Sequence, residues 1–466
     1  MIPLSLTNRE RSRNVDAWRI GVVRRRTAPK RGRDFLAALV EKKTCCLRKL
    51  GGCRAEEVRF GRFLRNPSVT KEEMLRTTAA ATGLRVGGRH VLAIQDTSEL
   101  NFSSHTLSKR GFGTVGNGVD IGFFIHPQLV VDALTGGVIG LAGASVINRL
   151  EGATKDRHKR KADEKESRRW LLGAQTAGEV LAQAAEITVV ADRESDIYDE
   201  FARRPANVQL LTRLAQDRAL VGGGRLFAFA QGLAEQLRYE IDVPAKGAKP
   251  ARKAVVSLSF GKTEVARPVN GIDKTLPPSV ALHIVDVREV ETPAGETPVR
   301  WLLATTHLVE SAEDARRMVF WYRRRWLIEQ LFRTLKSRCL RIEESQIIEV
   351  EPLAKLAVAA MIAAARVLRL VQARDGATGQ MLGDAFEPAD EPLIETLVVK
   401  LEGKTQKQKN PHAKGTLARA AWVIGRLGGW SGYVSGGYRP PGPKTMYDGL
   451  VQFDSIRRGW RMAKDV

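Results

Sequence analysis

The sequence predicts an α/β protein, in which a core of strands and helices is flanked by helical segments. Two observations lead to this prediction. Between about residues 85 and 212, short apolar runs rich in β-branched residues alternate with longer helical patterns. Towards both ends of the chain, apolar residues recur at helical spacing instead. With 466 residues, the chain is long enough for two or three domains with a sizeable core.

The order of the central elements indicates a particular core. Three strands are expected first, at residues 90–95, 128–133 and 137–141. A helix over 163–183 follows, and then strands at 187–191 and 208–212 with a helix between them. This order, β-β-β-α-β-α-β, is that of a ribonuclease-H-like (RNase H-like) core.

The helix that would close such a core is missing between Arg213 and Trp301. Instead, the segment from about 214 to 298 carries alternating runs typical of strands, at 237–243, 254–260 and 280–290. We therefore expect a β-rich insertion here. Helix is expected to resume at Ala312.

The flanking regions are expected to be helical. Residues 1–75 form the predicted N-terminal domain, with helices at Phe60–Leu64 and Val69–Thr77. The basic segment 24–33 could be a flexible arm lying along phosphates or simply a disordered tail. The RNase H-like domain, with its β-rich insertion, is expected at 76–380.

The C-terminal domain is expected at 381–466, with a helix over Leu417–Leu427. The stretch Pro440–Pro443 is expected not to be helical. Before this domain, Leu356–Leu370 is expected to form a buried, alanine-rich helix.

The charge balance indicates an anionic partner. Lysine and arginine number 75 against 52 acids, which gives a net charge of +23 and a pI near 10.1. Nucleic acid or an anionic membrane would attract such a chain. No charge-free apolar run of transmembrane length and no signal-peptide pattern occurs, so nucleic acid is favoured and no membrane is expected. The cysteines at 45, 46, 53 and 339 lack zinc-site spacing, so we expect reduced thiols in a cytosolic protein; zinc on the first three is a remote alternative.

Three acids stand where a catalytic metal site would need them. Asp96 and Asp192 each follow a predicted strand, at the edge of an α/β sheet where active sites usually lie. Glu329 lies on the helix that starts near Ala312. Two strand-end aspartates and a helix glutamate can hold two divalent cations about 4 Å apart, which activate a water or a 3′-hydroxyl and stabilise the leaving oxygen. The plainer alternative for each aspartate is a helix N-cap.

The helix that carries Glu329 has one polar and one apolar face. Its polar residues fall within about 80° of arc: Tyr322, Arg325, Glu329, Arg333 and Lys336. The opposite arc is expected to face the core and carries Phe320, Leu327, Ile328, Leu331, Phe332 and Leu335. A single carboxylate among cations and aromatics suits a metal ion beside a phosphate backbone. An ordinary solvated face is the alternative.

The spacing Tyr322-x2-Arg325-x3-Glu329-x6-Lys336 resembles the Y-R-E-K signature of the insertion-sequence-four family of bacterial DDE transposases. Further segments similar to the family stay in its order across about residues 58–430. They include Phe63–Pro67, Ala93–Thr97, Ala162–Ser167, Asp192–Ile197, Gly295–Pro298 and Arg426–Gly429. Residues 1–55 depart from the family's pattern, so the resemblance does not extend to them.

The resemblance implies a cut-and-paste transposase with an RNase H-like catalytic domain. Asp96, Asp192 and Glu329 would be both the catalytic residues and the ligands of Mg²⁺, for which Mn²⁺ could substitute. In this family, one strand is cut at the transposon end and its 3′-OH attacks the other strand to form a hairpin. Water then reopens the hairpin, and the 3′-OH joins target DNA.

The resemblance also implies which residues bind DNA. Tyr322, Arg325 and Lys336 would grip phosphates, and Arg333 stands where the family also has a basic residue. Trp301 falls at the family's base-stacking position. The remaining residues expected at the DNA are Trp326 and Arg213. For both tryptophans, core packing is the alternative.

The expected partners are double-stranded DNA, as transposon ends and target, and a second copy of the chain in a synaptic homodimer. The C-terminal domain would supply the dimer contacts, and the protein would work in the bacterial cytoplasm at the nucleoid. Two alternatives remain open at this point. One is a metal-dependent nuclease without strand transfer, and the other is an inactive DNA-binding inhibitor of transposition.

Overall fold

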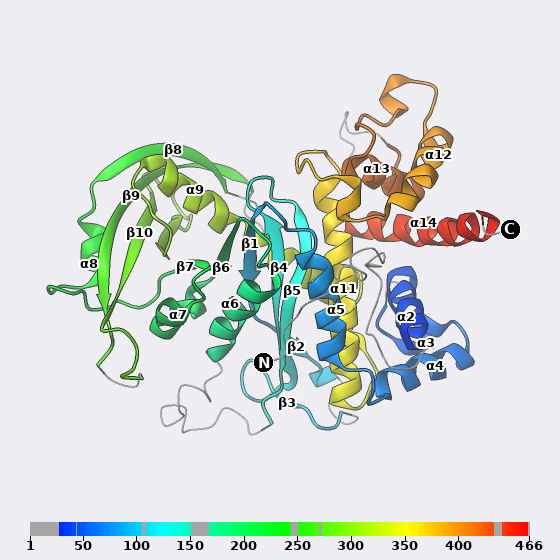
Figure 1. Ribbon diagram of the computed structural model, residues 1–466, viewed down its shortest axis with the longest axis horizontal. Helices are drawn as coiled ribbons and strands as arrows, with labels where there is room; N and C mark the ends of the chain where they lie inside the picture. The colour runs from blue at the N-terminus through cyan, green and yellow to red at the C-terminus, as the bar shows by residue number, and fades with distance from the viewer. Residues whose placement is uncertain are drawn as a thin grey trace.

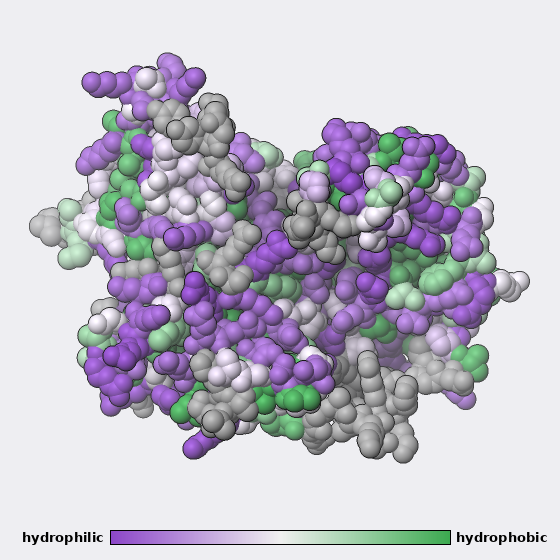
Figure 2. All heavy atoms as spheres, turned by 180° about the vertical axis from the view of Figure 1, so that it is seen from behind, coloured by the Kyte–Doolittle hydropathy of each residue, from purple (hydrophilic) through white to green (hydrophobic). Residues whose placement is uncertain are grey.

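The computed structural model describes residues 28–464, except residue 43 and the segments 105–108, 151–166, 244–249, 270–272 and 433–439. Within this part of the chain, a single mixed sheet of eleven strands runs through the protein, with helices against it and a largely helical region to one side (Figure 1). The α/β class predicted from the sequence is therefore confirmed. The reverse face of the molecule is covered mostly by hydrophilic side chains (Figure 2), in keeping with its high content of charged residues.

The first seven strands comprise the five predicted for the core and two short strands, β2 and β3, that were not predicted and that pair with β4. They are β1 (His90–Gln95), β2 (Ser98–Asn101), β3 (Gly113–Thr114), β4 (Ile121–Asp132), β5 (Val138–Ile147), β6 (Glu186–Ala191) and β7 (Gln209–Arg213). The spatial order is β5-β4-β1-β6-β7, with β4 antiparallel to its neighbours and β1, β6 and β7 mutually parallel. The carboxyl ends of β1 and β6 therefore lie side by side.

The insertion extends this sheet. Its strands are β8 (Glu235–Val243), β9 (Arg252–Ala266), β10 (Ser279–Glu289) and β11 (Arg300–Thr305), and β11 pairs antiparallel with β7. The short helix α8 (Leu226–Gln231) packs on β9 and β10. These long strands curve away from the core in Figure 1. The predicted β-rich insertion is confirmed, and its strands continue one side of the core.

The helices of the core differ in part from their predicted bounds. They are α6 (Arg168–Val180) and α7 (Tyr198–Arg203), and the 3₁₀ turn η3 (Arg193–Ser195) precedes α7. The helix expected over 163–183 is therefore shorter at its C-terminal end, and its first residues lie outside the described part of the chain. Apolar residues of α6 and of the buried strands share one core beneath the sheet.

The helix expected from Ala312 onward is interrupted. It consists of α9 (Ala312–Arg323), α10 (Trp326–Arg333) and a π-helical segment, η4 (Thr334–Arg338). Between α9 and α10, the backbone makes tighter i to i+3 hydrogen bonds, which change the rotation per residue. The prediction that Tyr322 lies on the polar face of this helix and Phe320 on the apolar face is therefore wrong. Phe320 is 41% exposed, and Tyr322 is only 6% exposed. The apolar stripe from Leu327 onward is buried as predicted.

The long helix α11 (Val350–Ala373) is the buried alanine-rich helix that the sequence predicts. It is long and apolar enough to cross a membrane, but 89% of its most apolar window is buried inside the protein, as in the core helix of a soluble protein. It runs between the sheet and the helical region (Figure 1) and contacts β5 on one side and α13 and α14 on the other.

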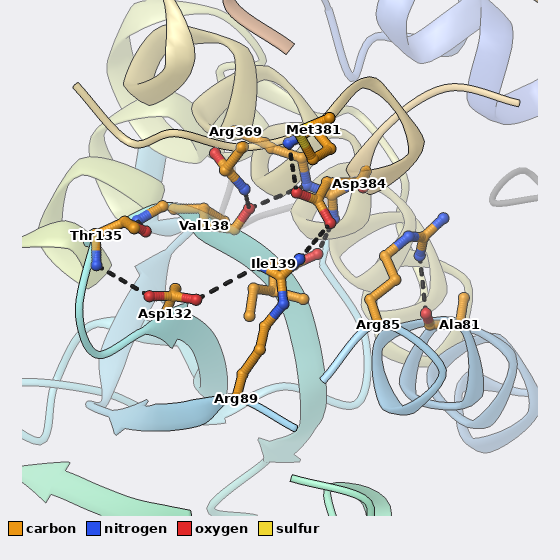
Figure 3. A network of polar contacts seen from close by, with 12 residues as sticks. Ala81, Arg85, Arg89, Asp132, Thr135, Val138, Ile139, Arg369, Met381 and Asp384 are labelled. Carbon is orange, nitrogen blue, oxygen red and sulfur yellow. Dashed lines mark hydrogen bonds and ion pairs between the residues drawn. The ribbon is translucent and has the colours of Figure 1, made fainter. Parts of the chain in front are cut away.

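A buried arginine of α11 and a half-buried arginine before β1 connect this region to the sheet (Figure 3). The Arg369 guanidinium donates to the carbonyl oxygens of Val138, Ile139 and Asp384, with Nε–O 3.2 Å for Val138 and Nη1–O 2.8 Å for Asp384. Arg89 pairs with the carboxylates of both Asp132 and Asp384. These contacts join the β4–β5 turn to the segment that follows α11.

The N-terminal helices are α2 (Ala28–Lys42), α3 (Leu47–Gly51), α4 (Arg54–Arg65) and α5 (Lys71–Gly83). The two helices predicted at Phe60–Leu64 and Val69–Thr77 correspond to α4 and α5, and α5 packs on β5 and α11. Both alternatives for 24–33, a flexible arm and a disordered tail, are wrong for residues 28–33, which begin α2. Residues 24–27 lie outside the described part of the chain. The four cysteines are free, and among the described residues they form no metal-binding cluster.

The C-terminal helices are α12 (Glu391–Leu401), α13 (Leu417–Leu427) and α14 (Pro443–Lys464), and the bounds of α13 match the prediction. Short 3₁₀ turns occur at Ile342–Glu344, Leu382–Asp384, Pro388–Asp390 and Gln406–Gln408. The prediction that Pro440–Pro443 is non-helical is wrong for Pro443. This residue is the first of α14, where proline's missing N–H group has no helical partner to lose.

Glycine allows α13 and α14 to approach each other closely. A Cβ atom on Gly449 would lie 1.6 Å from the carbonyl oxygen of Ile424, and one on Gly428 would lie 2.0 Å from that of Thr445. Neither distance is possible for real atoms. The contact between the two helices therefore requires glycine at both positions.

Candidate active site

The two strand-end aspartates occupy the carboxyl edge of the sheet. Asp96 follows β1 directly, and Asp192 follows β6. The Thr97 N–H donates to Asp96 Oδ1 at 2.8 Å, and the Glu194 N–H donates to Asp192 Oδ1 at 2.9 Å. Asp192 thus caps the turn η3, which was its alternative role, but one carboxylate oxygen remains outside that bond.

Arg325 joins the acids of the sheet to the acid of the helix. Its Nη1 donates to Asp96 Oδ2 at 2.8 Å, and its Nη2 donates to Glu329 Oε1 at 3.2 Å. The turn between α9 and α10 places this guanidinium at the carboxyl edge of the sheet. Of the residues predicted for the site, Asp96, Glu329 and Arg325 are therefore in direct contact.

The acids are electrostatically coupled. Burial raises the pKa of Asp96 from its ordinary 3.8 to about 6, and the charges of Asp192 and Glu329 act in the same direction. The Arg325 guanidinium and the Thr97 N–H act in the opposite direction. Because one guanidinium faces three carboxylates, the site retains negative charge that favours a bound cation.

The donor set suits hard divalent cations. All three side chains offer carboxylate oxygens, the donors that Mg²⁺ and Mn²⁺ prefer. Among the described residues, these acids do not bring one oxygen each within 4.8 Å of one another. Arg325 stands between the carboxylates of Asp96 and Glu329.

A cavity of about 910 Å³ opens beside these acids. Its wall includes five residues predicted from the sequence to contact DNA: Arg213, Trp301, Tyr322, Arg325 and Trp326. The rings of Trp301 and Tyr322 lie 6.2 Å apart, centre to centre. Burial raises the pKa of the Tyr322 hydroxyl, so this side chain is a neutral hydrogen-bonding group near pH 7. The cavity thus combines aromatic surface with cationic groups.

Two predicted DNA-binding residues follow Glu329 along the chain. Arg333 lies one turn beyond Glu329 on α10, and its guanidinium stacks over the ring of Trp326, 4.5 Å from the ring centre. This contact joins Arg333 to the wall of the cavity, because Trp326 lines it. Lys336 lies on the π-helical segment, where its ammonium is 3.6 Å from Glu343 Oε1.

Three basic residues of the cavity were missed by the sequence analysis: Arg252, Lys253 and Arg323. The first two open β9, where they pair with Glu289 and Glu240. Arg323 donates to the carbonyl oxygen of Asp242 at 3.2 Å. The start of an alternating strand was visible in the sequence, but its position opposite Tyr322 depends on how the insertion folds back over the core.

Comparison with protein families gives an independent result. The model of the family described as "Transposase DDE domain" matches residues 123–365, just over half of the chain. Asp192 and Glu329 lie inside the match, and Asp96 precedes it. DDE domains have an RNase H-like core, use divalent metal ions and catalyse DNA cleavage and strand transfer, and the sheet order found here agrees with that core. The chain belongs to the DDE transposase family.

Proposed function

We propose that the protein is a cut-and-paste transposase of the insertion-sequence-four type, with Asp96, Asp192 and Glu329 as its catalytic acids. The observation that carries this proposal is the position of Arg325. This residue binds Asp96 and Glu329 and also forms part of the aromatic, basic cavity. A plain nuclease would need the acids but not the adjoining cavity.

The three acids would hold two Mg²⁺ ions, with Mn²⁺ able to substitute. Such ions activate the attacking oxygen and stabilise the leaving one at phosphorus. Asp96 must be deprotonated to act as a ligand, and its raised pKa is offset when a cation adds positive charge nearby. Arg325 orients the acids before DNA enters and can then pair with a phosphate.

The cavity would receive a base that leaves the stack when a DNA end bends into a hairpin. Unstacking costs a few kcal/mol, and stacking on an aromatic side chain offsets this by about 1–3 kcal/mol per base. Trp301, backed by the ring of Tyr322, offers such a surface. Arg213 and Trp326 would hold the flanking strand, while Arg333 and Lys336 would contact phosphates further from the cut.

Trp301→Ala tests this role. Supplied with a labelled duplex bearing the end of its own element and Mg²⁺, the variant should nick the first strand at the normal rate and lose at least about 5-fold in hairpin product, because about 1–3 kcal/mol of stacking is removed. The control is Phe320→Ala, which removes an aromatic ring that is 41% exposed and lies outside the cavity. A normal hairpin yield from Trp301→Ala would refute the base-stacking role.

We further propose that the protein acts as a homodimer on two paired DNA ends, in the bacterial cytoplasm at the nucleoid. Residues 1–75 would recognise the transposon ends, residues 76–380 would catalyse the reaction, and residues 381–466 would supply the dimer contacts. The net charge of +23 favours such a DNA-bound state. Light scattering with end DNA should give two chains per complex, and a persistent one-to-one complex would contradict the dimer.

A further inference from the structure

A second group of potential metal ligands lies at the opposite edge of the sheet. His90 and Glu186 are the first residues of the parallel neighbours β1 and β6 and are paired in register. His307 follows β11. One potential ligand atom from each residue lies within 4.8 Å of the other two. Among the described residues, this is the one group of histidines, cysteines and acids that meets this criterion.

This cluster is separate from the proposed catalytic acids. Asp96 and Asp192 each follow six residues after His90 and Glu186 on the same two strands. At about 3.3 Å per residue, the two groups are roughly 20 Å apart. The cluster therefore lies at the edge of the sheet where β1 and β6 begin, away from the cavity and Arg325.

The ligand atoms are arranged as a coordination site requires. The Nδ1 atoms of both histidines face the carboxylate, with His90 Nδ1 3.2 Å from Glu186 Oε2 and His307 Nδ1 3.3 Å from Glu186 Oε1. In a tetrahedral Zn²⁺ site with bonds of about 2.0–2.1 Å, ligand atoms stand about 3.3–3.4 Å apart. The two nitrogen–oxygen distances, one to each oxygen of Glu186, are close to this spacing.

Around the hydroxyl of Thr188, the hydrogen-bond donors and acceptors of the cluster do not match in number. A bound cation would remove this mismatch. Thr188 Oγ1 lies 2.8 Å from His90 Nε2 and 2.7 Å from His307 Nε2. A hydroxyl has one hydrogen to donate and can accept two, and a neutral imidazole carries one hydrogen. If both rings carry it on Nδ1, the hydroxyl can serve only one Nε2. If either ring carries it on Nε2, a bare Nδ1 lone pair faces the carboxylate.

With a cation between the Nδ1 atoms and Glu186, both Nε2–H groups can donate to Thr188. Both Nε2–H groups and both Nδ1 lone pairs of the cluster then have a partner. Second-shell oxygens orient metal-bound histidines in the same way.

We propose that His90, Glu186 and His307 form a structural site for a divalent transition-metal ion, with Zn²⁺ as the best fit. Two imidazole nitrogens and a carboxylate are ligands that Zn²⁺ accepts, and water completes the tetrahedron. The ion would join β1, β6 and the segment after β11. The ring of Trp321 on α9 packs against both imidazoles, 4.5 Å from His90 and 5.2 Å from His307, centre to centre. Because α9 leads into Arg325 and Glu329, the ion would fix the position of the helix that precedes these two residues.

Metal binding to the full-length protein tests this proposal without measuring transposition. We would use chelator-treated protein with alkylated thiols and with Asp96→Asn and Glu329→Gln, so that the cysteines and the catalytic acids do not compete. Co²⁺ is the probe because its visible absorption reports nitrogen and oxygen ligands, and Zn²⁺ should displace it. One equivalent should bind, and Zn²⁺ should raise the melting temperature.

Glu186→Gln and His307→Asn in this background should each weaken Co²⁺ binding by more than about 100-fold, beyond the 10–100-fold typical of losing a second-shell residue. Glu186 is 44% exposed, so its variant should fold normally. His283→Asn is the control, since His283 makes the same kind of buried hydrogen bond but lies outside the cluster. If the background protein binds no Co²⁺, or if Glu186→Gln binds it as tightly as the His283→Asn control, the site does not exist.

Discussion

Replacing Asp96 with asparagine should make the metal-free protein more stable near neutral pH. The carboxyl has an ordinary pKa of 3.8, and burial raises this to about 6 in the folded protein. Because the folded state favours the protonated form, the wild type loses stability as pH rises from about 4 to about 6. A shift of this size corresponds to about 3 kcal/mol at neutral pH. Asparagine cannot ionise and should escape this loss.

This loss of stability is divided between two pH ranges. Of the roughly 3 kcal/mol, about 1.4 kcal/mol is lost between pH 5 and pH 7.5, and the remainder below pH 5. The substitution also disturbs the bond from Arg325 to Asp96 Oδ2, which changes stability by an amount that depends only weakly on pH. The test is therefore how the difference between variant and wild type changes with pH, and not its absolute value.

The assay is urea denaturation of both proteins in chelator at a series of pH values. The stability of Asp96→Asn relative to wild type should increase by about 1.4 kcal/mol from pH 5 to pH 7.5. The control is Asp375→Asn, because Asp375 is exposed and asparagine can also accept from the Ala377 N–H. A difference that stays constant with pH would refute the conclusion that burial and the neighbouring acids hold this carboxyl in a high-energy state.

Two further predictions concern the helices around the site. Arg369→Met should lower the free energy of unfolding by about 3–5 kcal/mol, because three buried carbonyl oxygens lose a charged donor and that of Val138 keeps the amide of Gln380. Urea denaturation measures this, and a loss no larger than that from the exposed Arg62→Met would contradict it. Gly449→Ala should cost at least about 3 kcal/mol, because its Cβ would meet the Ile424 carbonyl oxygen at 1.6 Å. The control is Gly459→Ala on the same helix, where the added Cβ meets open space. It should be neutral or should stabilise the fold by up to about 1 kcal/mol. Equal melting temperatures for the two glycine variants would rule out the close contact between the helices.

The core of the fold could be predicted because its signals are local. Strand-like runs ending at Asp96 and Asp192 determine both the elements and the edge at which the acids meet. The helix around Glu329 was also visible, but the tightened turn at Arg324 and Arg325 was not, since no glycine or proline marks it. That turn reverses the exposure expected for Phe320 and Tyr322.

Features that depend on distant segments could not be predicted. The cavity needs the insertion strands to fold back opposite Tyr322, and no local pattern specifies that contact. The cluster of His90, Glu186 and His307 joins residues more than 200 positions apart in the chain, outside any spacing typical of a metal site. Such sites become visible only when strand register is known.

The most direct test of the proposed active site compares wild type with Glu329→Gln on a labelled duplex carrying the end of the protein's own element, with Mg²⁺. Glutamine can still accept from Arg325 Nη2, so the fold and DNA binding should be preserved while the metal-binding carboxylate is lost. We predict a hairpin product from wild type and no cleavage by the variant at equal DNA occupancy. Nicking without a hairpin by wild type would indicate a nuclease, and binding without cleavage would indicate an inactive regulator. Cleavage by Glu329→Gln at the wild-type rate would contradict the assignment of the catalytic acids.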